Sequence, residues 1–193
     1  MITANHLIHD IREIASSGGN PNEFKISDEQ ILFWINEVRA MLISQKIKKR
    51  SDISDTWTQW IPCLELELVD ESECCDYPTG CYIMRSKLPL PNTVDASIDN
   101  TISAVLTLDG QSISKTNVSK QKYQAYSKFT SKKTRGWYLK DDYLYITNDK
   151  DLEVVQVSGV FEVPGSLSKY NSCSTNEPCY TDDSAFPVGV AMA

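Results

Sequence analysis

The 193-residue sequence is poor in the residues that most enzyme sites use. It has only two histidines, His6 and His9, and its eight glycines form neither a G-x-G-x-x-G motif nor a phosphate-binding P-loop. A nucleophilic serine or cysteine needs a base beside it. Two histidines three positions apart in one amphipathic segment favour a solvated or interfacial helix face instead. We therefore expect neither enzyme activity nor a cofactor.

Long apolar runs are also missing. The N-terminal segment lacks a basic start followed by an unbroken apolar stretch, and no segment approaches about 18 consecutive apolar residues. We therefore expect no secretion signal and no membrane span, and we predict an intracellular chain. In a reducing compartment the six cysteines are expected to be free thiols or ligands rather than disulfides.

The cysteines do not have the spacing that is typical of zinc sites. Cys74 and Cys75 are adjacent, and five residues separate Cys75 from Cys81 and Cys173 from Cys179, whereas paired zinc ligands usually stand about two to four residues apart. We expect no structural metal, and we interpret the stretch ECCDYPTGC as a turn between two strands with thiols that pack as small apolar side chains. A link between the two C-x5-C stretches, within or between subunits, stays open as an alternative.

An acidic cluster lies between residues 65 and 76. Such carboxylates could bind a cation or act as a paired acid and base. Glu65 and Glu67 alternate with leucines, however, which is typical of a strand with one solvated face. We therefore interpret these glutamates as the outer surface of a strand.

The first fifty residues contain two segments with helical periodicity. Apolar residues recur at helical spacing in 3–16, and the stretch SSGGNPNE ends that helix. The second helix begins with a capping box of Ser27 and Gln30. Its apolar stripe consists of Ile31, Trp34, Ile35, Val38 and Leu42. Further apolar residues widen this stripe, so we expect two covered sides, the second cover being either the β part of the chain or a neighbouring subunit.

From about residue 56 onward the apolar pattern has a period of two, which predicts strands. The predicted strands are WTQWIPCLELELV, CYIMRSK, AVLTL paired with QSISKT, WYLK paired with YLYIT, and LEVVQVSGVFEV. Asp109-Gly110 and Asp141-Asp142 are the predicted hairpin turns, the second being the weaker signal. The sequence therefore predicts an α+β protein, in which an N-terminal helical hairpin or bundle of two main helices precedes an antiparallel β domain with long loops and an extended C-terminal tail.

The composition divides the chain into three parts. They are a helical part at 1–52, an antiparallel β domain at 53–164 and an extended C-terminal tail at 165–193. The tail is rich in small polar residues and is predicted to contribute little core, so its removal should leave a folded β domain. Its apolar end, with Phe186, Val188 and Val190, favours docking on a partner.

Positive charge is concentrated between Asp109 and Asp141, where eight basic residues and no acidic residue occur although the chain has a net charge of −7. Interleaved aromatic residues suit contact with phosphates and stacked bases, or with an acidic protein surface. Because the whole chain is acidic, we do not expect sequence-specific DNA binding. The candidate contacts with DNA or a partner are Lys128, Lys132, Lys133 and Arg135.

Several segments follow one another along residues 1–164: the capped helix ISDEQILFWINEVRAMLI, then WIPCLELEL, CCDYPTGCYIMRSKLPLP, a hairpin with YLYIT, and VQVSGVFEVP. In this order they resemble head–tail adaptor proteins of short-tailed double-stranded DNA phages. Within that class the chain is most similar to the ring or connector proteins of crAss-like phages.

The resemblance implies a structural protein of the virion without catalysis, located at the head–tail junction and in the host cytoplasm during assembly. The implied partners are other copies in a homo-oligomeric ring, a dodecamer, together with the portal protein, a tail or next-ring protein, and double-stranded DNA that passes without sequence specificity. The apolar stripe of the second helix would form the subunit interface, and the apolar C-terminal end would dock on the portal or a neighbour. Two alternatives stay open: a nucleic-acid-binding module that uses residues 115–140, and a metal-dependent enzyme or zinc module centred on the cysteines.

Overall fold

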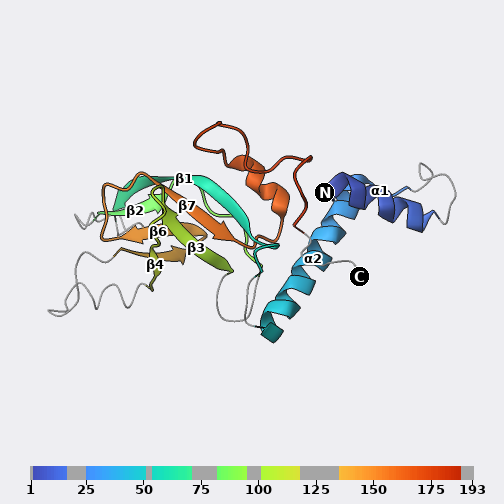
Figure 1. Cartoon of the computed structure of the whole chain (residues 1–193), viewed down its shortest axis with the longest axis horizontal. Helices are drawn as coiled ribbons and strands as arrows, with labels where there is room; N and C mark the ends of the chain where they lie inside the picture. The colour runs from blue at the N-terminus through green and yellow to red at the C-terminus, as the bar shows by residue number, and fades with distance from the viewer. Residues whose placement is uncertain are drawn as a thin grey trace.

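The computed structural model describes residues 2–16, 25–50, 54–70, 82–94, 101–117 and 135–187. Two N-terminal helices lie at one end of a β domain, and the C-terminal segment runs between the two parts (Figure 1). Helix α1 spans Ala4–Ala15 and helix α2 spans Asp28–Arg50, which confirms both predicted helices.

A side-chain cap defines the start of each helix, and one arginine joins the two helices. The Thr3 hydroxyl accepts a hydrogen bond from the backbone N–H of His6, and the Ser27 hydroxyl accepts one from the backbone N–H of Gln30 at 3.3 Å. These bonds satisfy N–H groups that have no partner within the helix. Arg12 of α1 binds the Asp28 carboxylate at 2.7 Å, so it also joins the two helices.

Seven strands form one sheet in the order β3-β7-β1-β2-β6-β5-β4. They are β1 (Gln59–Asp70), β2 (Tyr82–Ser86), β3 (Ile102–Thr107), β4 (Ser114–Lys115), β5 (Gly136–Lys140), β6 (Tyr143–Thr147) and β7 (Val154–Gly159). All neighbours in the sheet are antiparallel except β4 and β5, which are parallel. The prediction of an antiparallel domain is therefore wrong for this one pair.

The parallel pair follows from closure of the sheet. The segment that leads into β4 forms a hairpin with β3, in which the Ile113 N–H donates to the Val105 carbonyl at 2.9 Å and the Thr107 N–H donates to the Gln111 carbonyl at 3.0 Å. The two ends of the sheet are thus hydrogen-bonded to each other, giving a barrel-like sheet without a free edge at this point. Strand direction cannot alternate completely around a closed ring of seven strands, so one neighbouring pair must be parallel.

Both predicted hairpin turns are confirmed. Gly110 has φ +83°, and its N–H donates to the Thr107 carbonyl. Asp141 and Asp142 both have positive φ, 51° and 64°, which is the conformation of the two central residues in a type I′ hairpin turn. The backbone twist of such a turn matches the right-handed twist of the strands on either side.

Inward-facing side chains from the strands fill the barrel. This core contains Ile61, Leu64, Leu66, Met84, Val105, Ile113, Trp137, Leu144, Ile146, Val155 and Val157. On β1, Glu65 and Glu67 alternate with the buried leucines and pair across the strand boundary with Lys87 at 2.7 Å and Arg85 at 2.6 Å. The interpretation of these two glutamates as the outer surface of a strand is confirmed.

The C-terminal segment is part of the folded protein as far as Pro187. It begins with the 3₁₀ helix η2 (Pro164–Lys169) and places Leu167, Tyr170 and Tyr180 in the barrel core. The Tyr170 hydroxyl donates to the Pro89 carbonyl. The prediction that residues 165–193 contribute little core is therefore wrong for the described part, because isolated apolar residues in an aperiodic segment pack into the barrel.

A disulfide between Cys63 and Cys173 attaches the C-terminal segment to β1. The expectation that the cysteines are free thiols is wrong for this pair. Cys179 has a free thiol, and burial raises its pKa, which keeps it protonated. Cys74, Cys75 and Cys81, in the predicted ECCDYPTGC turn, lie outside the described residues.

Candidate functional site

One face of α2 packs on the β domain. Ile43 and Ile47 form an apolar cluster with Trp57, Val94 and Val160, which come from the barrel side of the interface. This contact fixes the C-terminal half of α2 against the barrel, and it is the first of the two covers expected from the apolar composition of the helix.

A second face of α2 is apolar and exposed. Trp34, Val38, Met41 and Leu42 retain 45%, 51%, 52% and 38% of their accessible surface. Positions i, i+4, i+7 and i+8 lie along one side of a helix. We call these four residues the α2 apolar face. Phe33, also exposed, lies on a different flank of the same helix.

The structure divides the predicted stripe of the second helix. Ile31 is fully buried within the chain and Ile35 is half-buried, whereas the other three predicted residues belong to the exposed α2 apolar face. Among the described residues, eight of the fourteen exposed large apolar side chains precede residue 43. Exposed apolar surface is therefore concentrated on the helical part rather than spread over the molecule.

Phe186, one of the predicted docking residues, is buried in its own chain. Its N–H donates to the Ile2 carbonyl at 2.9 Å, and the Arg39 guanidinium lies 5.9 Å from the centre of its ring. Val188 and Val190 lie outside the described residues.

Of the predicted basic contacts, the structure describes Arg135. Its guanidinium binds the carboxylate of Asp149 at 2.7 Å, and Asp149 is mostly buried. Lys128, Lys132 and Lys133 lie outside the described residues. The sequence gives no local signal that the Asp149 carboxylate lies beside Arg135, so Asp149 is not among the predicted residues.

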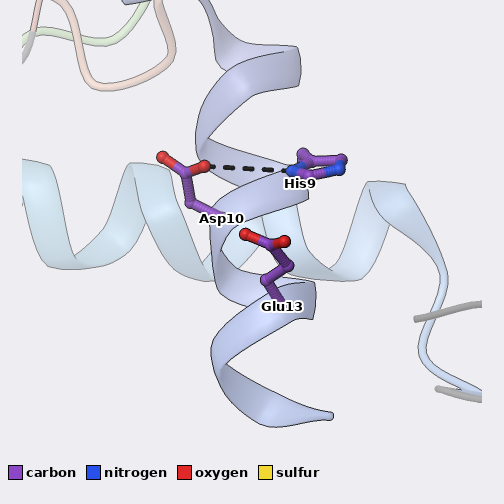
Figure 2. Close-up of side chains that lie close together, drawn as sticks. All are labelled: His9, Asp10 and Glu13. Carbon is purple, nitrogen blue, oxygen red and sulfur yellow. Dashed lines mark ion pairs between the residues drawn. The ribbon is translucent and has the colours of Figure 1, made fainter. Parts of the chain in front are cut away.

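Three side chains with metal-ligand chemistry lie together on α1. Figure 2 shows His9, Asp10 and Glu13 on one stretch of the helix. The His9 Nδ1 atom lies 3.9 Å from a carboxylate oxygen of Asp10. All three are exposed. Neighbouring polar residues on a solvated helix produce such a group without a ligand, and no buried polar atom points to an ion here.

The α2 apolar face, on a helix that is packed on the barrel, suits an interface with another protein. The family model described as phage tail ring protein 2 (CrAss_Ring_2) matches residues 6–193, and the chain belongs to this family. No curated protein matches the chain. Membership makes it a structural component of a phage tail that works in an oligomeric ring, and it implies a non-enzymatic role. Neither described helix combines the length and apolarity needed to cross a membrane.

Proposed function

We propose that this protein is a connector subunit at the head–tail junction of a short-tailed double-stranded DNA phage. Copies form a ring, a dodecamer, that binds the portal protein, extends the DNA channel and offers a platform to the tail or to the next ring. The helical part at 1–52 packs within the ring, and the β domain at 53–164 builds the wall.

The main observation that supports this proposal is the α2 apolar face. Single exposed apolar residues are ordinary on protein surfaces. Four exposed apolar residues on one side of a helix are a different case, because together they form a continuous apolar surface. In a chain of a ring-forming family, we expect a neighbouring protein to bury that surface. A ring joins each subunit to the next through two different surfaces, and the α2 apolar face is one of them.

Two further features support the contacts with the portal and with DNA. The apolar end of the chain continues past Phe186 with Val188 and Val190, which we propose as the portal or neighbour contact. The chain has a net charge of −7. An acidic channel wall repels phosphates and lets the duplex slide, whereas a basic lining would retain it through counterion release.

The native mass of the assembly tests the proposal. Light scattering should show a large closed ring for the purified chain, either alone or after mixing with the portal protein of the same genome. The ring's mass divided by the subunit mass gives the copy number. A chain that stays monomeric in both samples would contradict the connector role.

The alternative of a nucleic-acid-binding module is not favoured, because family membership indicates a tail ring protein. Arg135, the one described member of the predicted basic set, is engaged with Asp149 of its own chain. Binding to duplex DNA at low salt that weakens steeply with salt concentration would be needed to restore that alternative.

A further inference from the structure

Arg39 joins three parts of the chain through one buried side chain. It lies in the middle of α2 and retains 4% of its accessible surface. Its Nε donates to the Pro187 carbonyl and one terminal nitrogen donates to the Phe161 carbonyl, both at 2.7 Å. The same nitrogen lies 3.4 Å from the Glu162 carbonyl, and the guanidinium lies over the Phe186 ring. The side chain therefore connects α2, the residues that follow β7 and the C-terminal segment.

Core packing alone does not explain an arginine at this position. Among the described residues no carboxylate pairs with Arg39, and its Nη2 has no hydrogen-bond partner. Burial lowers the pKa of Arg39 to about 10. An uncompensated buried charge costs free energy, and an apolar side chain of similar size would fill the same space. What a guanidinium adds is a rigid fork of donors that fixes the relative positions of several carbonyl groups.

The segment that Arg39 binds is attached to the barrel at its other end. Tyr180 lies in the barrel core, and Cys173 is linked to Cys63 of β1. Residues 181–185 between these anchors and Phe186 are mostly exposed, with one turn closed by a hydrogen bond from the Ser184 N–H to the Thr181 carbonyl. Figure 1 shows the end of this segment passing from the β domain toward α2. We call residues 181–187 the strap.

We propose that the strap, latched by Arg39, holds α2 at a defined angle to the barrel and thereby positions the α2 apolar face for the next subunit. Ring closure makes this angle important. Every subunit repeats the same rotation, so an error in helix orientation accumulates around the ring and prevents closure. Arg39 is then a positioning residue, and this role in assembly rests on the proposed function.

Hydrogen exchange of the Phe186 amide tests the latch directly, because that N–H is bonded to the Ile2 carbonyl only when the strap is seated. The variants are Arg39→Met, which removes the donors, and Arg39→Lys, which keeps the charge but loses the fork. Lys48→Met removes a charge from an exposed position of the same helix and serves as the matched control. We expect exchange at Phe186 to rise at least about tenfold in Arg39→Met, by less in Arg39→Lys, and not at all in Lys48→Met.

Native mass is the second measurement. Arg39→Met should keep amide protection in the barrel strands but lose ring formation, while Lys48→Met assembles like the unchanged chain. If Arg39→Met fails to fold, Phe186→Ala releases the strap from its other side and should give the same two results. Unchanged exchange of the backbone amide at position 186, in a folded Arg39→Met or Phe186→Ala variant, would overturn the latch.

The two readouts separate this inference from the proposed function. If the unchanged chain forms no ring with or without the portal, the proposed function and the role of the latch in assembly both fail, but the exchange data still decide whether Arg39 seats the strap. If the strap opens in Arg39→Met while rings form normally, the positioning role is wrong and the connector role stands.

Discussion

Cys63 on β1 and Cys173 in the C-terminal segment form a disulfide that bridges 110 positions of the sequence. It closes most of the β domain into one covalent loop. It also attaches the C-terminal segment to β1 at Cys173, while the other end of that segment contacts α2 at Arg39. This disulfide, the packing of Leu167, Tyr170 and Tyr180 in the core, and the Arg39 contacts each attach the C-terminal segment to the rest of the fold.

Replacing both bridged cysteines by serine should lower the free energy of unfolding by about 2–5 kcal/mol, because the unfolded chain regains the freedom that a long closed loop removes. Urea unfolding of the oxidised protein and the double-serine variant measures the difference. Addition of a reductant should destabilise only the unchanged chain. Identical unfolding curves in all samples would show that the link contributes nothing.

Val38→Glu should abolish ring formation without unfolding the monomer. Val38 is 51% exposed, so the new carboxylate stays solvated in the free subunit but would be buried without a partner in the interface. Glutamate also has the higher helix propensity, which rules out helix loss as the cause of a defect. Leu108→Glu, at an exposed residue of the β3 hairpin, is the control and should assemble normally in the same light-scattering experiment. Equal masses for both variants would contradict the interface.

Removal of residues 165–193 should prevent cooperative folding, because it deletes three core residues and one half of the disulfide. A chain that ends at Pro187 retains these contacts and should unfold cooperatively. Thermal unfolding followed by circular dichroism distinguishes the two truncations. A single sharp transition in the shorter chain would show that the barrel core is complete without the C-terminal segment.

Gly110→Ala should destabilise the fold by about 1–2 kcal/mol, since φ is +83° and an L side chain is strained there. No atom lies within 4 Å of the added Cβ, so backbone strain alone determines the loss. Gly165→Ala, which also meets no atom within 4 Å and has no positive φ, is the control and should be neutral or slightly stabilising. Equal unfolding midpoints for the two variants would contradict this explanation.

Tyr170→Phe should destabilise the protein at pH 8, and this loss should shrink as the pH rises from 10 to 12. Burial raises the pKa of Tyr170 from 10 to about 12 in the folded protein. The folded state therefore binds more protons than the unfolded state between these values, so the stability contributed by the phenol is complete below pH 10 and is lost as the pH passes 12. Urea unfolding of both proteins across this range checks the sign. A constant difference would mean that the phenol is not buried.

Local sequence patterns were sufficient to predict the helices, strands and hairpin turns. Helical spacing with a Ser27 cap predicts α2, alternation of leucine with glutamate predicts β1, and two turn dipeptides predict two hairpins. These signals work because each depends on residues that are neighbours along the chain. The family resemblance also came from their order, and the family match over residues 6–193 agrees with a ring protein of crAss-like phages.

No local sequence pattern predicts how the residues of the candidate site are arranged in space. Whether Ile43 or Val38 packs on the barrel depends on how α2 is rotated against Trp57, Val94 and Val160. Helical periodicity does not specify that rotation. The parallel β4/β5 pair arises only when the sheet closes on itself. Likewise, Arg39 reads as an ordinary surface residue of a charged helix until the Phe161 and Pro187 carbonyls are placed around it.

The amino-acid order alone thus decided the helices, the strands, the turns and the absence of known catalytic motifs, because these follow from periodicity, backbone preference and residue chemistry within short windows. The closure of the barrel and the exposed α2 apolar face were decided by how separate elements pack against one another. The Cys63–Cys173 link and the Arg39 contacts join residues more than a hundred positions apart. Such contacts depend on how preformed elements pack as a whole, and a short stretch of sequence carries no record of that packing.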